Sequence, residues 1–137
     1  MTMEPSLLDT DTLSEVMKGV NQGVQSNARQ YLRAFGSFTF SLITRYEILR
    51  GLKARRATRQ IARFEQRCQQ SVVLPVTDAI IMRAADVYAL LHQEGQLISD
   101  ADILIAATAL EHSLVMVTEN VDHFRRIPGL PIESWRT

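Results

Sequence analysis

The sequence predicts an α/β fold with three layers, α/β/α, in which a mostly parallel sheet of roughly five strands lies between two layers of helices. Short apolar runs alternate along the chain with longer segments whose apolar residues keep helical spacing. A length of 137 residues with 46% hydrophobic content suits one domain over residues 1–137. The sequence shows no internal repeat, glycine-rich phosphate loop or interdomain linker.

The first part of the chain predicts two strands with helices between them. Residues 5–9 form a short apolar run typical of a strand, and Thr10 or Asp11 can cap the helix that follows. A polar stretch then leads into a second helix over residues 24–33. Residues 38–43 combine aromatic and β-branched side chains, which favours the next strand.

The middle of the chain continues the alternation of helices and strands. Residues 71–76 are apolar and β-branched, which predicts a third strand after a basic helix. Thr77 or Asp78 can cap the next helix, which keeps one apolar face and is expected to stop at Gly95.

The last part of the chain predicts a helix and two more strands. The helix starts at Ser99 or Asp100, and its small residues allow close packing against the sheet. Residues 114–117 are fully apolar, as expected of a strand buried on both faces. Residues 130–135 favour a fifth strand at an edge of the sheet, where Pro131 is tolerated.

Composition argues against several classes of protein. The single Cys68 cannot form an internal disulfide and has no cysteine partner for a zinc site, which suits a reducing compartment. Residues 1–5 lack the basic and apolar regions of an export signal, and no apolar run approaches the roughly 20 residues of a membrane helix. We therefore expect a cytoplasmic protein that has no membrane partner.

Positive charge gathers in one part of a chain whose formal net charge is zero. Between residues 45 and 67, eight arginine or lysine residues stand against two glutamates. Arginines recur every four residues, so on one helix they form a ridge beside Arg56 that suits the phosphates of RNA: Arg55, Arg59, Arg63 and Arg67. Arg55, Arg59 and Arg63 are the ones expected to bind RNA. A solvated helix face and a docking surface for an acidic partner are the two other interpretations.

Four segments, far apart in the sequence, each place an acid or an amide beside apolar residues. They are centred on Asp9, Glu47, Asp102 and Asn120. A carboxylate loses its hydration when it is buried alone, so several carboxylates on core-forming elements indicate a cation that gathers them. Asp9 and Asn120 follow predicted strands, and parallel sheets bind ligands at the carboxyl ends of their strands. The pattern predicts one cleft that holds a divalent metal ion.

The order and spacing of these segments resemble the PIN-domain endoribonucleases, and among them the VapC-like toxins of bacterial toxin–antitoxin pairs. The resemblance covers nearly the whole chain, through residues 7–14, 41–51, 102–109, 117–124 and 126–135. It implies a PIN-like fold, an acidic site for Mg²⁺ or Mn²⁺ and an RNA substrate, which is transfer, ribosomal or messenger RNA. It also implies a homodimer and a cognate antitoxin protein as partner.

Carried over by position, the resemblance implies that Asp9, Glu47 and Asp102 line the metal site. Asn120 falls on the fourth acidic position of the family, where an amide can coordinate through its carbonyl or position a water without adding charge. Ser41 and Thr118 match hydroxyl positions that line such sites.

Three further acids lie close to these positions in the sequence. Asp11 stands where many relatives carry asparagine, and Asp122 can partly substitute for the missing charge of Asn120. Asp100 and Asp102 point about 200° apart on a helix, so we expect Asp100 to act as an N-cap beside the site.

The chemistry of these residues agrees with the resemblance. Mg²⁺ prefers oxygen ligands and keeps several waters, so two or three carboxylates can hold it. A bound ion lowers the pKa of a water and neutralises charge on phosphate oxygens. We therefore expect a Mg²⁺- or Mn²⁺-dependent endoribonuclease that hydrolyses phosphodiester bonds, in which Glu47 or Asp102 orients the attacking water.

Two alternatives stay open. Asp9 and Asp11 resemble the aspartate pair of haloacid-dehalogenase-like phosphatases, although Leu13 departs from that family's pattern. The other alternative is a noncatalytic PIN-like adaptor that binds RNA or protein through the arginine ridge, which the uncharged Asn120 favours. The histidines show no metal-ligand spacing and no nucleophile partner, and His123 lies nearest the predicted cleft.

Overall fold

A computed structural model describes residues 3–136, which form five strands and seven helices. Residues 1, 2 and 137 of the single domain expected over residues 1–137 lie outside the described part. The strands are β1 (Ser6–Leu8), β2 (Thr39–Ser41), β3 (Val72–Leu74), β4 (Val115–Val117) and β5 (Ile132–Glu133). The helices are α1 (Thr10–Lys18), α2 (Gln22–Phe35), α3 (Leu42–Ala54), α4 (Thr58–Gln69), α5 (Asp78–Gln93), α6 (Asp100–Glu111) and α7 (Val121–Phe124).

The strands form one sheet in the order β3-β2-β1-β4-β5, and each neighbouring pair is parallel. This confirms the predicted parallel sheet, with β5 at an edge as expected, although it is shorter than residues 130–135. Leu8 at the end of β1 lies opposite Val117 at the end of β4. The residues that follow these two central strands therefore emerge side by side.

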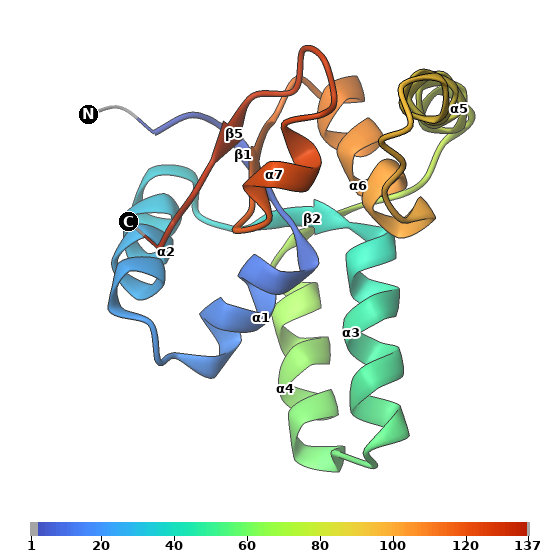
Figure 1. Ribbon diagram of the computed structural model, residues 1–137. Coiled ribbons are helices and arrows are strands. Elements are labelled where there is room, and N and C mark those ends of the chain that lie inside the picture. Colours follow the sequence, from blue (N-terminus) through green and yellow to red (C-terminus); the bar gives the residue numbers. More distant parts are fainter. Residues whose placement is uncertain (1–2, 137) are drawn as a thin grey trace.

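Two hydrophobic cores flank the sheet because successive strand residues point to opposite faces. Leu7 and Met116 pack in a core with α5 and α6, whereas Leu8 and Val117 pack in a second core with α1 and α2. Figure 1 shows the two groups of helices on opposite sides of the sheet. The predicted three-layer fold is confirmed.

The junction between β2 and α3 differs from the predicted strand over residues 38–43. Ser41 ends β2 and caps α3, because its side-chain oxygen accepts a hydrogen bond from the backbone N–H of Ile43 at 3.0 Å. Leu42 and Ile43 therefore belong to a helix despite their apolar character. The cap outweighs their strand propensity, and the predicted boundary was wrong by two residues.

Two other helix caps also differ from expectation. Asp9, rather than Thr10 or Asp11, caps α1 by accepting a hydrogen bond from the backbone of Thr12. Ser99, one of the two residues expected to start the next helix, caps α6, so Asp100 is not its N-cap. Asp9 and Asp102 therefore lie at the N-cap of α1 and in the first turn of α6.

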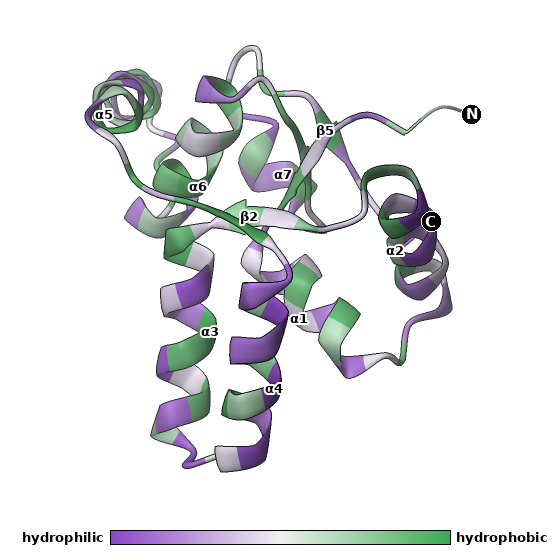
Figure 2. Ribbon diagram, turned by 180° about the vertical axis from the view of Figure 1, so that it is seen from behind, coloured by the Kyte–Doolittle hydropathy of each residue, from purple (hydrophilic) through white to green (hydrophobic). Residues whose placement is uncertain are grey.

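Helices α3 and α4 pack against each other and project from the body of the molecule as an arm (Figure 1). Arg55 ends α3 and Arg56 adopts a left-handed backbone with φ 54°, so the chain turns there. The expected continuous ridge was wrong in this respect: Arg55 lies in the turn, whereas Arg59 and Arg63 lie on α4. Figure 2 shows that most of the α4 ribbon is coloured as hydrophilic.

No helix within residues 3–136 combines the length and the apolar character that a membrane crossing requires.

Candidate active site

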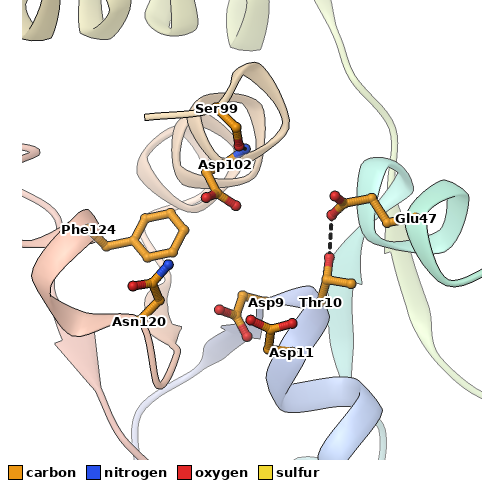
Figure 3. A pocket seen from close by; sticks show the side chains of 8 residues that line it. All are labelled: Asp9, Thr10, Asp11, Glu47, Ser99, Asp102, Asn120 and Phe124. Carbon is orange, nitrogen blue, oxygen red and sulfur yellow. Dashed lines mark hydrogen bonds between the residues drawn. The ribbon is translucent and has the colours of Figure 1, made fainter. Parts of the chain in front are cut away.

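A cavity of about 200 Å³ lies at the carboxyl ends of the central strands. Its lining residues come from four segments that are distant in sequence, as Figure 3 shows: Asp9, Thr10, Asp11, Glu47, Ser99, Asp102, Asn120 and Phe124. The structure thus brings together all four of the residues predicted to be catalytic. None of these lining residues of the described chain is a lysine or an arginine.

Asp9 is the most constrained acid of the cavity. It follows β1, and its backbone N–H donates to the carbonyl of Val117, which ties it to β4 at 3.0 Å. Its Oδ1 accepts from the backbone N–H of Thr12 at 2.8 Å, and its Oδ2 accepts from the hydroxyl of Thr118 at 2.5 Å. Both carboxylate oxygens therefore have fixed directions.

Burial gives Asp9 an unusual proton affinity. The residue is only 5% exposed, and this desolvation raises the pKa of its carboxyl from 3.8 to about 6. The hydrogen bonds from Thr118 and Thr12 stabilise the charged form and oppose the rise in pKa. A nearby cation would favour the ionised carboxylate further.

Glu47 reaches the cavity from the second turn of α3. Its Oε1 accepts a hydrogen bond from the hydroxyl of Thr10 at 2.6 Å, and that hydroxyl lies 3.0 Å from the hydroxyl of Thr44. Since a carboxylate only accepts, Thr10 donates to Glu47 and Thr44 donates to Thr10. Arg50 lies 3.6 Å from the other carboxylate oxygen of Glu47. The Thr10 hydroxyl, which Thr44 holds in turn, thus orients the Glu47 side chain.

Asp102 lies in the first turn of α6, where Ser99 receives a hydrogen bond from its backbone N–H at 3.2 Å. Burial raises the pKa of Asp102, and the negative charges of Glu47 and Asp11 raise it further. Asp102, Glu47 and Asp11 thus line one cavity, and each carboxylate disfavours the charge on the others.

Asn120 follows β4 and precedes the short helix α7. Its backbone N–H donates to the hydroxyl of Thr118 at 2.9 Å, and its side-chain Nδ2 lies 2.8 Å from Nδ1 of His123. Nδ1 of His123 is also 3.9 Å from a carboxylate oxygen of Asp102. The proximity of His123 to the cleft agrees with the expectation from sequence.

The four supporting residues predicted from sequence divide into two pairs. Thr118 and Ser41 are fully buried and do not line the cavity: Thr118 holds Asp9, and Ser41 caps α3. Asp122 and Asp100 are exposed and also lie outside the lining. Asp122 points into solvent, with its side chain 89% exposed, because it lies on the outer side of α7. The expectation that Asp122 replaces the charge missing at Asn120 was therefore wrong.

A neighbouring carboxylate fixes the segment that carries Thr118 and Asn120. Glu119 turns away from the cavity and accepts hydrogen bonds from the Ser134 hydroxyl at 2.6 Å and the Trp135 backbone at 3.1 Å. Trp135 is fully buried in the core with α2. The C-terminal segment therefore anchors one wall of the cavity.

The donor set of the cavity fits a hard divalent cation. Four carboxylates and one amide supply oxygen ligands, and no cationic side chain of the described chain lines the cavity to neutralise them. Within residues 3–136, no three acidic, histidine or cysteine side chains lie close enough together to form a ready metal site. Mg²⁺ needs only one or two direct carboxylates, because it keeps several waters and takes oxygens from a phosphate substrate. The cavity suits that mode of binding.

Sequence reasoning missed several lining residues. Thr10 was considered only as a helix cap, although a hydroxyl directly after Asp9 was the available signal for a contact with Glu47. Ser99 was likewise considered only as a cap. Phe124 was given no part in the site, although it is both buried and part of the lining. No sequence signal distinguishes these shared roles, because they depend on how four segments meet.

The arginines predicted to bind RNA lie away from the cavity lining, on the arm. Arg55, Arg59 and Arg63 are exposed, and none forms an ion pair with another described residue. Arg67 differs from them, because its guanidinium lies over the ring of Phe38 at 5.4 Å.

Comparison with known proteins places this site in a family. The chain is 27% identical over 121 residues to the ribonuclease VapC1 of Methanocaldococcus jannaschii, covering 88% of this chain and 79% of that one. It is 28% identical over 130 residues to the tRNA(fMet)-specific endonuclease VapC of Salmonella typhimurium, covering 94% and 96%. The solved structure of DNA-bound VapBC from Salmonella typhimurium contains a chain with a TM-score of 0.85, 28% identity and coverage of 97% and 99%.

The family itself follows from a match over most of the chain. The sequence model of the PIN domain family matches residues 6–130. This range includes strands β1 to β4 and every residue that lines the cavity. This match replaces the resemblance to haloacid-dehalogenase-like phosphatases, which rested on Asp9 and Asp11 alone. The chain belongs to the PIN domain family.

Proposed function

We propose that this protein is a Mg²⁺- or Mn²⁺-dependent endoribonuclease that acts as the toxin of a toxin–antitoxin pair. The observation that carries the proposal is the convergence of Asp9, Glu47 and Asp102 with Asn120 in one cavity at the carboxyl ends of parallel strands. Similar proteins named ribonuclease and tRNA(fMet)-specific endonuclease support RNA as the substrate class.

The residues that would hold the metal ion are Asp9, Asp102 and Glu47. When bound, Mg²⁺ or Mn²⁺ supplies a Lewis acid that lowers the pKa of a water and neutralises charge on the phosphate oxygens. Asn120 adds a neutral oxygen ligand or a hydrogen-bonding group for water at the opposite wall of the cavity.

The protein groups of the cavity hold and orient the reacting parts. Asp9 is immobilised by hydrogen bonds to both of its oxygens, so it contributes a charge in a fixed position. Glu47 retains lone pairs beyond the one that Thr10 occupies, and it can accept a hydrogen bond from the attacking water. A correctly placed water needs no large rearrangement before it attacks the phosphorus atom.

The arm supplies a surface for the RNA backbone. Arg55, Arg59 and Arg63 are exposed and have no protein counter-ion among the described residues, so their charges are available to phosphates. Contacts of this kind strengthen binding without reading the sequence of bases. The bond that is cut is then set by the cavity.

Two protein partners belong to the proposal. A cognate antitoxin is supported by the similarity to a chain of the VapBC structure. A homodimer is supported by exposed apolar side chains on two helices, namely Leu42 and Tyr46 on α3 and Ile81 and Met82 on α5. Such side chains favour association because burying them removes apolar surface from water.

The deciding experiment is a cleavage assay on labelled transfer and ribosomal RNA with Mg²⁺ or Mn²⁺. Because one relative is named as specific for tRNA(fMet), initiator transfer RNA is the first substrate to test. Discrete fragments should appear, and they should disappear with a chelator and in Asp102→Asn. Asp100→Asn is the matched control, since it removes a carboxylate from the same helix turn outside the cavity.

The noncatalytic adaptor remains the second candidate, and one observation favours it. The described carboxylates do not converge as tightly as a ready metal site requires, and the fourth position is the neutral Asn120. Calorimetric titration with Mn²⁺ separates the two functions. Binding that is lost in Asp102→Asn supports the nuclease, whereas RNA binding without any metal binding or cleavage supports the adaptor.

A further inference from the structure

The last described residues of the chain connect helix α2 to the wall of the cavity. Residues 132–136, which we call the C-terminal strap, run from the edge strand β5 to α2, as the dark red end of the ribbon shows in Figure 1. The strap lies beyond residues 6–130, the range that the PIN domain model matches. None of its residues lines the cavity, so any effect on the site passes through the residues that the strap contacts.

Three hydrogen bonds hold the strap to the segment that follows β4. The backbone N–H of Thr118 donates to the carbonyl of Glu133 at 3.0 Å. Glu119 contributes the other two, because its carboxylate oxygens accept from the Ser134 hydroxyl at 2.6 Å and from the Trp135 backbone at 3.1 Å. Glu119 therefore supplies two of the three contacts between the strap and the cavity wall.

Thr118 connects this contact to the cavity. The residue is fully buried, and its hydroxyl donates to Oδ2 of Asp9 at 2.5 Å and accepts from the backbone N–H of Asn120 at 2.9 Å. Of two neighbouring side chains, Glu119 thus contacts the strap and Thr118 contacts Asp9. A displacement of this segment would move the Thr118 hydroxyl away from Asp9.

At its other end the strap lies directly against α2. The carbonyl of Trp135 accepts a hydrogen bond from the side chain of Asn27 at 2.9 Å, and the Trp135 ring is fully buried. A Cβ at Gly23 would lie 2.5 Å from the carbonyl oxygen of Arg136, which is too close for any side chain. Glycine therefore permits the close approach of the two backbones. The strap is thus fixed to a helix that contributes no residue to the cavity.

We propose that Glu119 is a positioning residue of the active site, which uses the C-terminal strap to hold Thr118 against Asp9. The inference rests on the proposed function and deepens it. Residues that orient the ligands of a metal ion typically change metal affinity or activity by about 10 to 100-fold when they are replaced. Glu119 acts one contact further out, so we expect an effect at the lower end of this range. Displacing the strap at Gly23 should have the same consequence.

The first test follows the backbone amide of Thr118 by NMR and needs no catalysis. We expect its hydrogen exchange to become about 10-fold faster in Glu119→Ala, because lost hydrogen bonds favour local opening of the segment. Gly23→Ala should give the same change from the far end, since the added methyl group pushes the strap away from α2. Glu119→Gln should keep slow exchange, because its amide can accept from Trp135 and donate to Ser134.

Two controls separate a local effect from a loss of overall stability. The backbone amide of Ile81, which donates to the carbonyl of Thr77 at 3.0 Å in α5, should exchange at an unchanged rate. Gly51→Ala is the matched control for Gly23→Ala, since a new Cβ at this helical glycine meets only a flexible side chain at 3.8 Å. Unchanged exchange at Thr118, or equal acceleration at Thr118 and Ile81, would overturn the proposal.

The second test measures RNA cleavage by the same variants. We expect kcat to fall about 10-fold in Glu119→Ala and Gly23→Ala with a nearly unchanged KM, because positioning rather than substrate binding is lost. Glu119→Gln should recover kcat, and Glu133→Ala, which removes an exposed carboxylate from the strap, should match the wild type. A normal kcat in Glu119→Ala, or a change in KM alone, would contradict the proposal. If the wild-type protein cleaves no RNA, the proposed function fails, and exchange of the Thr118 amide still decides whether Glu119 and the strap hold this segment.

Discussion

The acidic cavity and the basic arm carry opposite charges, and they also hold those charges in opposite ways. Asp9 is 5% exposed, and both of its carboxylate oxygens accept hydrogen bonds from α1 and the loop after β4. Arg59 and Arg63 are exposed on α4 and make no ion pair with any residue from 3 to 136. The cavity fixes the position of each charge, whereas the arm only places charge in a region.

The difference in burial between the two sets of charges determines how strongly each set can interact with a ligand. A buried carboxylate interacts strongly with a cation, because little water screens it, and a small displacement changes that interaction greatly. Exposed arginines are screened by salt, and their contributions to phosphate binding are individually modest and roughly additive. We therefore expect the chemistry to depend on the cavity and the affinity on the arm, so the effects of substitutions in the two regions should differ in size and in salt dependence.

The largest effect is expected from Asp9→Asn. We expect cleavage to fall by about 10³-fold or more, because the change removes a charge that would hold an ion worth several kcal/mol to the reaction. Single-turnover cleavage with saturating Mg²⁺ measures the loss. Asp122→Asn is the control, because this carboxylate is 89% exposed outside the cavity. Equal activity of the two variants would contradict the assignment of Asp9.

The same substitution should stabilise the fold at neutral pH. The pKa of Asp9 is raised by burial from 3.8 to about 6, so the folded protein binds the proton more tightly than the unfolded chain. The free energy of unfolding therefore falls as pH rises between these two values, and the full penalty of roughly 1 to 3 kcal/mol applies above about pH 6. Asp9→Asn avoids this penalty but disturbs the hydrogen bond from Thr118.

Urea unfolding with a chelator present tests this sign. Asp9→Asn should be more stable than the wild type at about pH 7.5, and the difference should shrink near pH 4, where Asp9 is protonated in the folded state. Adding Mn²⁺ should stabilise the wild type more than the variant, because a ligand stabilises the state that binds it. A variant that is less stable at both pH values would show that Asp9 is mainly structural.

An intermediate effect is expected from Thr10→Val. The change keeps the shape of the side chain but removes the hydroxyl that donates to Glu47 at 2.6 Å. We expect kcat to fall about 10-fold, equivalent to one hydrogen bond of 1 to 1.5 kcal/mol, and Thr10→Ser to recover it. Thr58→Val, at an exposed threonine on α4, is the matched control. A fall in KM alone would argue that Thr10 does not orient Glu47.

Much of the fold followed from local patterns, because short apolar strands buried on both faces leave few other arrangements. Leu7 and Leu8 illustrate this: adjacent apolar residues enter different cores, as a central strand requires. The boundaries were less predictable. At Ser41 a side-chain cap competes with strand propensity, and the cap prevails through one hydrogen bond to Ile43 that no composition reveals.

For the candidate site, the sequence likewise predicted which residues lie together but not how each side chain is oriented. Asp9, Glu47, Asp102 and Asn120 could be placed together, because each follows a strand or lies in the first two turns of a helix at the same edge of the sheet. The orientation of single side chains could not be placed in the same way. Asp122 is two residues from Asn120 but points into solvent, since successive residues of a helix diverge by about 100°. The contact between Thr10 and Glu47 could not be predicted from the sequence, because it depends on how α1 and α3 pack.

The smallest effect for each charge removed is expected on the arm. We predict that replacing Arg55, Arg59 and Arg63 together by alanine weakens RNA binding at low salt and lowers the slope of log affinity against log salt by about 2, since each phosphate contact on single-stranded RNA contributes about 0.7. The matched control removes three exposed positive charges elsewhere, at Lys18, Arg29 and Arg33 on α1 and α2. Electrophoretic mobility shift over a range of salt concentrations measures both slopes. The rate of cleavage at saturating RNA should be unchanged in both variants. Equal slopes for the two variants would show that the arm binds RNA no better than other exposed positive charges, and the arm would then not be the region that sets affinity.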